Sequence, residues 1–332
     1  MSVTKDSALS WGIIGAGDVV INKSGPSLVC AERSEITAIM GRRSNATRRL
    51  ALCLGAQFWT TDVDGVLNNH DIDIVYIATP PNSHMKYVRA VSAAGKHVLV
   101  EKPMAMNEIE GRQMIALCED AGVKLFVAYY RRFQPHVVHM RKVLADNVIG
   151  RPVFGVVDLA SSSIASRLSQ GKREWRDDDR IASGGTLIDI GSHRIDLMIW
   201  LLGPFVSIQS VALSHYPDLE VEQTATIVVE MTSGSLCSIT GDFYTGRDAD
   251  RFLIRGEEGL LIADPLDGHA LSIHTENGKQ ERRFEPLSYS HLGLVRHIES
   301  VLIDGKTNEV SGYDGIATEI VLDRVRGQAI RI

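Results

Sequence analysis

A lysine stands directly after a short apolar run, in the segment Glu101-Lys102-Pro103. A lysine ammonium near a reacting oxygen can donate a hydrogen bond to it and stabilise developing negative charge. The run 97–100, bounded by Gly95 and a proline, indicates a buried strand, and ligands of open α/β sheets bind at the carboxyl ends of strands. We therefore expect Lys102 to be catalytic, although a lysine taken at random is more often a solvated surface side chain.

Three polar residues, Asp189, His193 and Asp196, follow one another at one-turn spacing in the mostly apolar stretch 186–202. If this stretch is a helix, all three lie on one face. An imidazole can act as a general base near neutral pH, and a carboxylate one turn away can orient it. A lone histidine would more often be a core residue, but the pair favours catalysis by His193, positioned by Asp189. No further ligands occur at convincing spacing, so we expect no metal.

A glycine-rich turn opens the chain, where Gly15 and Gly17 follow a short apolar strand. Such a turn places backbone N–H groups at a helix N-terminus, where a dinucleotide pyrophosphate binds. We expect Gly15, Gly17, Asp18 and Val19 to contact the cofactor. Val20 stands where the third glycine of the fingerprint, or an alanine, would allow close packing of helix and strand.

The end of the second predicted strand points to the cofactor type. An NAD-binding unit has an acidic residue near this point for the ribose 2′-OH, but here Gly41 is followed by Arg42, Arg43 and Ser44. Guanidinium groups match a 2′-phosphate, and cations at a helix N-terminus are unfavourable without an anion. The simpler reading is a solvated, arginine-rich helix start. We expect these four residues to bind NADP(H), in preference to NAD(H).

The elements that position these residues alternate between strand and helix through the first 130 residues, which predicts an N-terminal Rossmann domain with a doubly wound parallel sheet at 1–130. Residues 131–332 are predicted to form an α+β domain with a large, mostly antiparallel open sheet. Hairpin turns are expected at Ser233-Gly234 and Asn277-Gly278. In one variant of this prediction, the last helix packs against the first domain.

Bulk properties exclude several classes of function. The chain has 332 residues and a net charge of -6, which gives no global field for nucleic acid or an anionic membrane. No apolar run approaches the ~20 residues of a membrane span. The four cysteines are scattered, and residues 1–10 are polar without an apolar signal segment. These features predict a soluble, cytoplasmic protein.

Several motifs, taken together and in order, resemble the glucose–fructose oxidoreductase, inositol dehydrogenase and MocA (Gfo/Idh/MocA) family. They are Gly12-Ile-Ile-Gly-Ala-Gly17, Ala78-Thr-Pro-Pro-Asn82 with His84, Glu101-Lys102-Pro103, Trp175-Arg176, and Gly184-Gly185 leading to Asp189 and His193. The resemblance covers nearly the whole chain. The chain departs from the family at Val20 and at Tyr129-Tyr130-Arg131-Arg132, where many relatives carry an asparagine.

The resemblance implies a Rossmann domain, an α/β domain whose open sheet often mediates dimers or tetramers, a nicotinamide cofactor, and sugars, polyols or their derivatives as substrates. Lys102 is similar to the family's lysine at the nicotinamide, and Asp189 and His193 match its substrate-side pair. Further cofactor contacts are implied for Thr79, Pro80, Asn82, His84, Glu101, Trp175 and Arg176.

These observations predict an NADP(H)-dependent oxidoreductase that interconverts a hydroxyl and a carbonyl group on a small carbohydrate-like substrate. We expect a homodimer or homotetramer. One alternative is an NAD-dependent glycosidase or elimination enzyme that retains its cofactor and uses transient oxidation. Another is a sugar- or nucleotide-sensing regulator, which would have no need of Lys102, Asp189 and His193 together.

Overall fold

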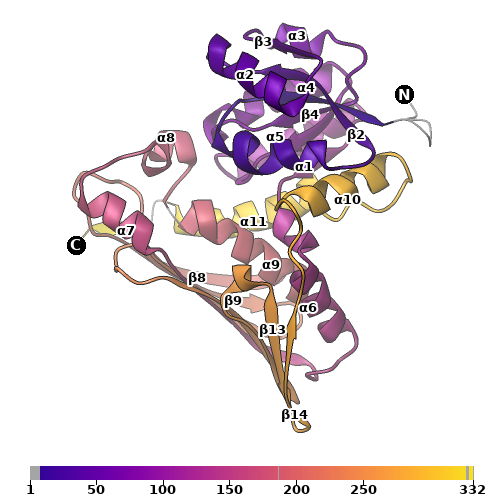
Figure 1. Cartoon of the computed structure of the whole chain (residues 1–332). Coiled ribbons are helices and arrows are strands. Elements are labelled where there is room, and N and C mark those ends of the chain that lie inside the picture. Colours follow the sequence, from indigo (N-terminus) through magenta and orange to yellow (C-terminus); the bar gives the residue numbers. More distant parts are fainter. Residues whose placement is uncertain (1–7, 186, 327–328, 332) are drawn as a thin grey trace. The chain divides into compact units, whose positions relative to one another are not determined.

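The computed structural model describes residues 8–185, 187–326 and 329–331, and it divides into two compact units (Figure 1). The first comprises Met1–Phe133 with Leu287–Ile316, and the second comprises Gln134–Pro286 with Ala317–Ile332. The predicted ranges, 1–130 and 131–332, differ from these units chiefly in 287–316, which returns to the first unit. Most of the polar N-terminal segment lies outside the described residues, as does Thr186, the first residue of a predicted helix.

The first unit contains a six-stranded parallel sheet in the order β3-β2-β1-β4-β5-β6. Its strands are β1 (Leu9–Ile14), β2 (Ser34–Met40), β3 (Phe58–Thr60), β4 (Ile74–Ile77), β5 (His97–Val100) and β6 (Leu125–Val127). Every residue of β1, β4 and β6 is buried, as expected for parallel strands covered on both faces. The order reverses between β1 and β4, so the predicted doubly wound Rossmann sheet is confirmed.

Helices connect these strands: α1 (Gly25–Val29), α2 (Ser44–Leu54), α3 (Asp64–Leu67), α4 (His84–Ala93) and α5 (Glu108–Asp120). Helix α5 is capped by Asn107, whose side chain accepts a hydrogen bond from the Glu110 N–H at 2.9 Å. The Glu110 carboxylate accepts from the Met106 N–H at 3.0 Å. This cap fixes where the chain re-enters a helix after the segment that carries Lys102.

The returning segment supplies α10 (Leu292–Leu302) and the start of α11 (Gly312–Val325). It pairs with β6, since the Val127 N–H donates to the Val310 carbonyl at 2.8 Å. Arg132, 1% exposed, donates to the Glu309 carbonyl and to Asp314 Oδ1, at 2.5 and 2.9 Å. A buried guanidinium needs such partners, so the first unit is complete only with residues near the end of the chain.

The second unit is built on a nine-stranded sheet in the order β14-β13-β12-β11-β7-β10-β9-β8-β15. Its strands are β7 (Pro152–Ala160), β8 (Phe205–Ser214), β9 (Thr224–Met231), β10 (Leu236–Asp242), β11 (Ala249–Gly256), β12 (Gly259–Ala263), β13 (Ala270–Thr275), β14 (Gly278–Arg283) and β15 (Ala329–Arg331). The pairs β7–β10 and β8–β15 are parallel, and the other pairs are antiparallel. Tight turns lie at both predicted hairpins, with φ of 82° at Gly234 and 107° at Gly278.

The remaining helices of the second unit are α6 (Pro135–Ala145), α7 (Ser162–Ser169), α8 (Asp179–Ala182) and α9 (Ser192–Leu202), and α9 continues a π-helical turn, η5 (Leu187–Gly191). Helices α6 and α9 lie against one face of the sheet (Figure 1). The core between them includes Met140, Leu197, Ile227 and Ile239. In the described part of the chain, every helix is too short or too polar to cross a bilayer.

Candidate active site

The glycine turn after β1 has the geometry of a phosphate-binding loop. Gly15 has a φ of 116°, and a Cβ on it would meet the Ala78 carbonyl oxygen at 2.3 Å. Only glycine fits there. A Cβ built on Gly17 has no described atom within 4 Å, so this side of the turn is open. These residues fit a dinucleotide pyrophosphate, with Asp18 exposed and Val19 half-buried beside the opening.

The helix after this turn begins with a π-helical segment, η1 (Val20–Ser24), in which Val20 is fully buried. The close approach expected of a glycine at position 20 occurs instead at Gly25, where a Cβ would meet the Val20 carbonyl oxygen at 2.4 Å and Leu54 Cδ1 at 2.6 Å. The chain therefore accommodates valine in the fingerprint with a wider turn, followed by a glycine five residues later.

Gly41, at the end of β2, is buried, and a Cβ there would meet Thr47 Oγ1 at 2.4 Å and Ala16 Cβ at 2.8 Å. Packing between the glycine turn and α2 is therefore one reason for this glycine. Arg42, Arg43 and Ser44 are exposed. In α2, all of which the structure describes, the first turn contains no acidic residue. The N–H groups at this helix end and the two arginines can bind an anion.

His84 is fully buried and joins two loops at the carboxyl ends of the strands. Its Nε2 faces the Thr79 carbonyl at 2.8 Å and its Nδ1 faces the Met104 carbonyl at 3.1 Å. Burial lowers the pKa of His84, against the two carbonyls, which favour the charged ring. A neutral ring donates to one carbonyl at a time, so His84 acts as a link between backbones and would support a cofactor indirectly. Pro80 is half-buried and Asn82 is exposed.

Glu101 is 8% exposed and anchors the segment that carries Lys102. The Tyr76 hydroxyl donates to its Oε1 at 2.5 Å, and the Lys102 N–H donates to Oε2 at 3.2 Å. His291 Nε2 lies 3.6 Å from Oε1. Burial acts to raise the pKa of Glu101, but His291, Lys102 and Tyr76 outweigh it and hold the pKa below its ordinary value. The carboxylate is thus fixed, and Lys102 follows it half-buried at the end of β5.

His291 is a site residue that the sequence analysis missed. It is 2% exposed, and its ring stacks on Tyr130 with 4.4 Å between centroids. Tyr130 belongs to the segment that departs from the family pattern. Through this stacking it supports the histidine that lies beside Glu101. No local signal marks His291, because it reaches Glu101 from a segment 190 residues further along the chain.

In the second unit, η5 and α9 carry the predicted polar residues. Asp189 lies in η5, with 24% of its side chain exposed, whereas His193 and Asp196 are 5% and 0% exposed. A π-helical turn is wider than an α-helical turn, so the α-helical spacing that predicted one common face does not apply between Asp189 and His193. Asp189 Oδ2 lies 3.1 Å from Arg176 Nε, which makes Arg176 a direct partner of the predicted catalytic carboxylate.

A pocket of about 330 Å³ opens beside Asp189 within the second unit. Its lining residues are Ser163, Ile164, Arg167, Glu174, Arg176, Asp177 and Asp189. Arg167 forms a two-pronged ion pair with Asp177 at 2.5 and 2.8 Å, and Arg176 lies 3.5 Å from Glu174. The pocket is thus rich in hydrogen-bonding groups, and it is walled partly by α7, which the sequence analysis did not predict. Trp175 is 38% exposed, with the Arg176 guanidinium 4.4 Å from its ring centre.

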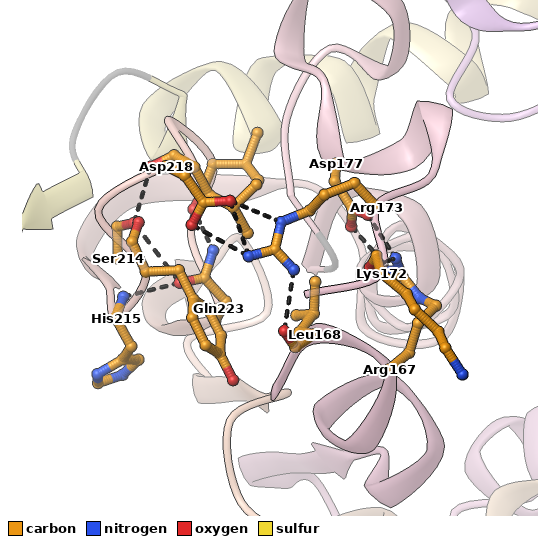
Figure 2. Close-up of polar contacts among 12 residues, drawn as sticks. Arg167, Leu168, Lys172, Arg173, Asp177, Ser214, His215, Asp218 and Gln223 are labelled. Atoms are coloured by element: carbon orange, nitrogen blue, oxygen red, sulfur yellow. Dashed lines mark hydrogen bonds and ion pairs between the residues drawn. The ribbon is translucent and has the colours of Figure 1, made fainter. Parts of the chain in front are cut away.

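The wall of this pocket is tied to the loop between β8 and β9 (Figure 2). Arg173 donates to both carboxylate oxygens of Asp218, at 2.9 and 3.0 Å, and to the Leu168 carbonyl at 2.9 Å. Gln223 holds the same loop, accepting from the His215 N–H at 2.7 Å. These contacts fix the segment from α7 to Asp177, and with it Arg167 and Arg176.

The structure therefore groups the predicted residues by unit. The glycine turn, the arginines after β2, His84, Glu101 and Lys102 belong to the first unit, whereas Trp175, Arg176, Asp189 and His193 belong to the second. Among the described residues, no group of three or more His, Cys, Asp or Glu side chains is arranged to hold a metal ion.

Two family models match this chain: the oxidoreductase family, NAD-binding Rossmann fold (GFO_IDH_MocA), over residues 9–129, and the GFO/IDH/MocA C-terminal domain over residues 137–262. The chain belongs to the Gfo/Idh/MocA family. The predicted membership is confirmed, and with it a nicotinamide-dependent oxidoreductase acting on hydroxyl or carbonyl groups of sugars and related compounds.

Comparison with individual proteins gives the same family assignment. Oxidoreductase P35 of Formosa agariphila is 32% identical over 318 residues, which cover 89% of this chain and 98% of the relative. D-xylose 1-dehydrogenase (NADP(+)) 2 of Haloferax volcanii is 25% identical, over 96% of each chain. The crystal structure of aldose-aldose oxidoreductase from Caulobacter crescentus, complexed with glycerol, has a TM-score of 0.85 at 25% identity, over 97% of each chain.

Proposed function

We propose that this chain is an NADP(H)-dependent oxidoreductase that interconverts a hydroxyl and a carbonyl group on a monosaccharide or small polyol, in the cytoplasm. The pocket of about 330 Å³ beside Asp189 carries this proposal, because its volume suits a small ligand and its lining offers donors and acceptors for several hydroxyl groups. The names of two relatives, a xylose dehydrogenase and an aldose–aldose oxidoreductase, support a sugar substrate.

The residues have distinct roles in this proposal. The nicotinamide cofactor, when bound, supplies or accepts the hydride. His193 takes the hydroxyl proton in oxidation and returns it in reduction. Lys102 donates a hydrogen bond to the same oxygen and stabilises its developing charge. Asp189 positions His193, and it forms an ion pair with Arg176, which also lines the pocket. Glu101, held by Tyr76 and His291, keeps Lys102 in place.

The preference for NADP(H) rests on the start of α2. Arg42 and Arg43 are exposed there, next to a helix N-terminus whose first turn contains no acidic residue among those described. An acidic residue at this point would repel the 2′-phosphate of NADP(H). Because none is present there, the chain lacks this means of rejecting NADP(H). The name of one relative, D-xylose 1-dehydrogenase (NADP(+)) 2, whose similarity covers 96% of this chain, supports the same preference.

A screen of the purified protein tests this function. Aldoses, anhydro sugars, polyols and keto sugars would be incubated with NADP+, NADPH, NAD+ or NADH, and nicotinamide absorbance followed. We expect turnover of at least one neutral monosaccharide or polyol, faster with the NADP couple. Turnover of a glycoside with no net change in absorbance, and with cofactor retained through gel filtration, would instead identify the transient-oxidation alternative.

The open face of the large sheet supports a homodimer or homotetramer. Strand register places Phe154, Val156, Val211, Val228 and Leu236 on the face opposite the core. Val211 is 60% exposed and Leu236 is 48% exposed. Apolar side chains gathered on one face are typical of an interface. Light scattering of the wild type and of a Val211→Lys, Val228→Lys variant would test this, with a smaller assembly expected for the variant.

A further inference from the structure

Glu222 is a buried carboxyl group for which the proposed mechanism has no use. It lies between β8 and β9 and is 4% exposed. Its Oε2 accepts a hydrogen bond from the Gly185 N–H at 3.1 Å. Its Oε1 is buried without a hydrogen-bond partner among the described residues. An ionised carboxylate offers about four acceptor positions, so this environment solvates the charged form poorly.

The Gly184-Gly185 pair is shaped around this side chain. A Cβ on Gly185 would meet the Glu222 carbonyl oxygen at 2.3 Å and its side-chain Cδ at 2.6 Å. Ser183 and Gly184 both have positive φ, 71° and 139°. The turn 183–185 therefore packs directly on Glu222, and it leads into η5 and α9, which carry Asp189 and His193.

Arg326, directly after α11, holds the same turn. Its Nε donates to the Ser183 carbonyl at 2.8 Å, and its Nη2 donates to Glu319 Oε2 at 2.8 Å. It also pairs with Asp323. Its positive charge is thus already shared by two carboxylates before Glu222 is counted. Among the described residues, the charged group that acts on Glu222 is Arg326, which itself pairs with Glu319 and Asp323.

We infer that Glu222 is a positioning residue for this active site: as a neutral carboxyl group it fixes the 183–185 turn, and its ionisation loosens that turn and the helix carrying Asp189 and His193. The step from the turn to catalysis rests on the proposed function. Burial raises the pKa of Glu222 to about 7, although hydrogen bonds from the backbone N–H groups of Glu222 itself, Gly185 and Leu187 and the charge of Arg326 act in the opposite direction. Glu222 therefore ionises, and the 183–185 turn loosens, as the pH rises toward and through neutrality.

Hydrogen exchange of the amides in 183–193 tests the turn without any substrate. The raised pKa implies that local opening of the wild type becomes about tenfold easier between pH 6 and pH 8, after correction for intrinsic exchange. Glu222→Gln keeps the size and an acceptor for the Gly185 N–H but cannot ionise, so its opening should not change with pH. Glu220→Gln, at an exposed neighbour, should behave as the wild type does.

The pH–rate profile of kcat/KM is the second measurement. We expect the ratio of Glu222→Gln to wild type to rise with pH between pH 6 and pH 9. Exchange that varies with pH equally in both proteins would overturn the inference, as would a constant ratio of rates. If exchange behaves as expected but no sugar is turned over, the held turn stands and the proposed function fails.

Discussion

The carboxylate of Asp189 and the guanidinium of Arg176 form an ion pair, with 3.1 Å between Oδ2 and Nε. Sequence spacing suggested His193 as the partner of Asp189, whereas this contact adds a cation from the Trp175-Arg176 motif. Both side chains are partly exposed, at 24% and 42%, so the pair alone adds little to stability. The ion pair matters because it orients the Asp189 carboxylate at the pocket.

A double-mutant cycle measures this orientation. Asp189→Asn should lower kcat/KM by about 10- to 100-fold, on the scale of a hydrogen bond to a charged group, and should shift the acidic limb of the pH–rate profile. Arg176→Ala should lower it less, and the double variant should be little worse than Asp189→Asn because the two residues act as a unit. Fully additive losses would show that the ion pair has no part in catalysis.

Lys102 and His193 should be needed for turnover more than for folding. Lys102→Ala and His193→Ala are each expected to lower kcat by roughly 100-fold or more, the scale of losing an oxyanion donor or a general acid–base group. Lys124→Ala is a matched control, because Lys124 is exposed at the N-terminal end of β6, whereas Lys102 follows the C-terminal end of the neighbouring parallel strand β5. Steady-state kinetics and circular dichroism would separate the two effects. Near-wild-type turnover would remove that residue from the mechanism.

Arg42 and Arg43 should set cofactor preference. The wild type should bind NADPH at least about tenfold more tightly than NADH at low salt, since one hydrogen bond to a charged group contributes about 1.5–3 kcal/mol. Arg42→Ala with Arg43→Ala should abolish the difference, and high salt should narrow it. Arg89→Ala, at an exposed position of α4, is the control. Gly41→Asp is a poor probe because a Cβ lacks room there. Fluorescence titration giving equal wild-type affinities would reject the NADP assignment.

Glu222 should make global stability depend on pH. Its pKa is about 7 in the folded chain, against 4.5 for an unperturbed glutamate side chain. The folded state therefore retains a proton that the unfolded state releases, and stability falls as the pH rises from 4.5 to about 7. Relative to wild type, Glu222→Gln should gain up to ~3 kcal/mol above this window and nothing below it. Urea unfolding at acidic and alkaline pH measures the gain. A gain independent of pH would contradict the assignment.

Gly185 should tolerate no side chain. Gly185→Ala places a methyl group 2.3 Å from the Glu222 carbonyl oxygen, which should cost about 1–3 kcal/mol of stability through overpacking. The matched control is Gly246→Ala in the same unit, where a Cβ has no described atom within 4 Å. Thermal unfolding of both variants provides the comparison. Equal midpoints would mean that the turn can move aside at no cost.

Local chemistry made much of the fold predictable. The alternation of strand and helix patterns through residues 1–130 indicated the parallel sheet, and Asn107 and Glu110 are residue types that commonly form the helix cap they make here. Segments with weak or ambiguous patterns were missed. Strand β14 contains no apolar residue and is exposed throughout, so only its pairing with β13 reveals it. Helix α7 was not predicted, because its serines and aliphatic residues suit either a helix or a strand.

The candidate site was predictable in its residue types and less so in its partners. Lys102, Asp189 and His193 stand out because polar groups interrupt apolar runs. Arg176 beside Asp189 and His291 beside Glu101 depend on tertiary contacts that no local pattern encodes. The π-helical turn at Leu187–Gly191 was not predicted, because over so few residues its hydrophobic pattern does not differ from that of an α-helix.

The discontinuous first unit has a consequence for synthesis on the ribosome. Domains generally fold as units, the N-terminal one first. Here β6 and Arg132 find their partners at Glu309, Val310 and Asp314, so a nascent chain that ends before α10 leaves a strand edge unpaired and a guanidinium without its acceptors. The first domain to emerge is thus among the last to be completed, and truncation near residue 285 should yield an aggregation-prone Rossmann sheet rather than an isolated domain.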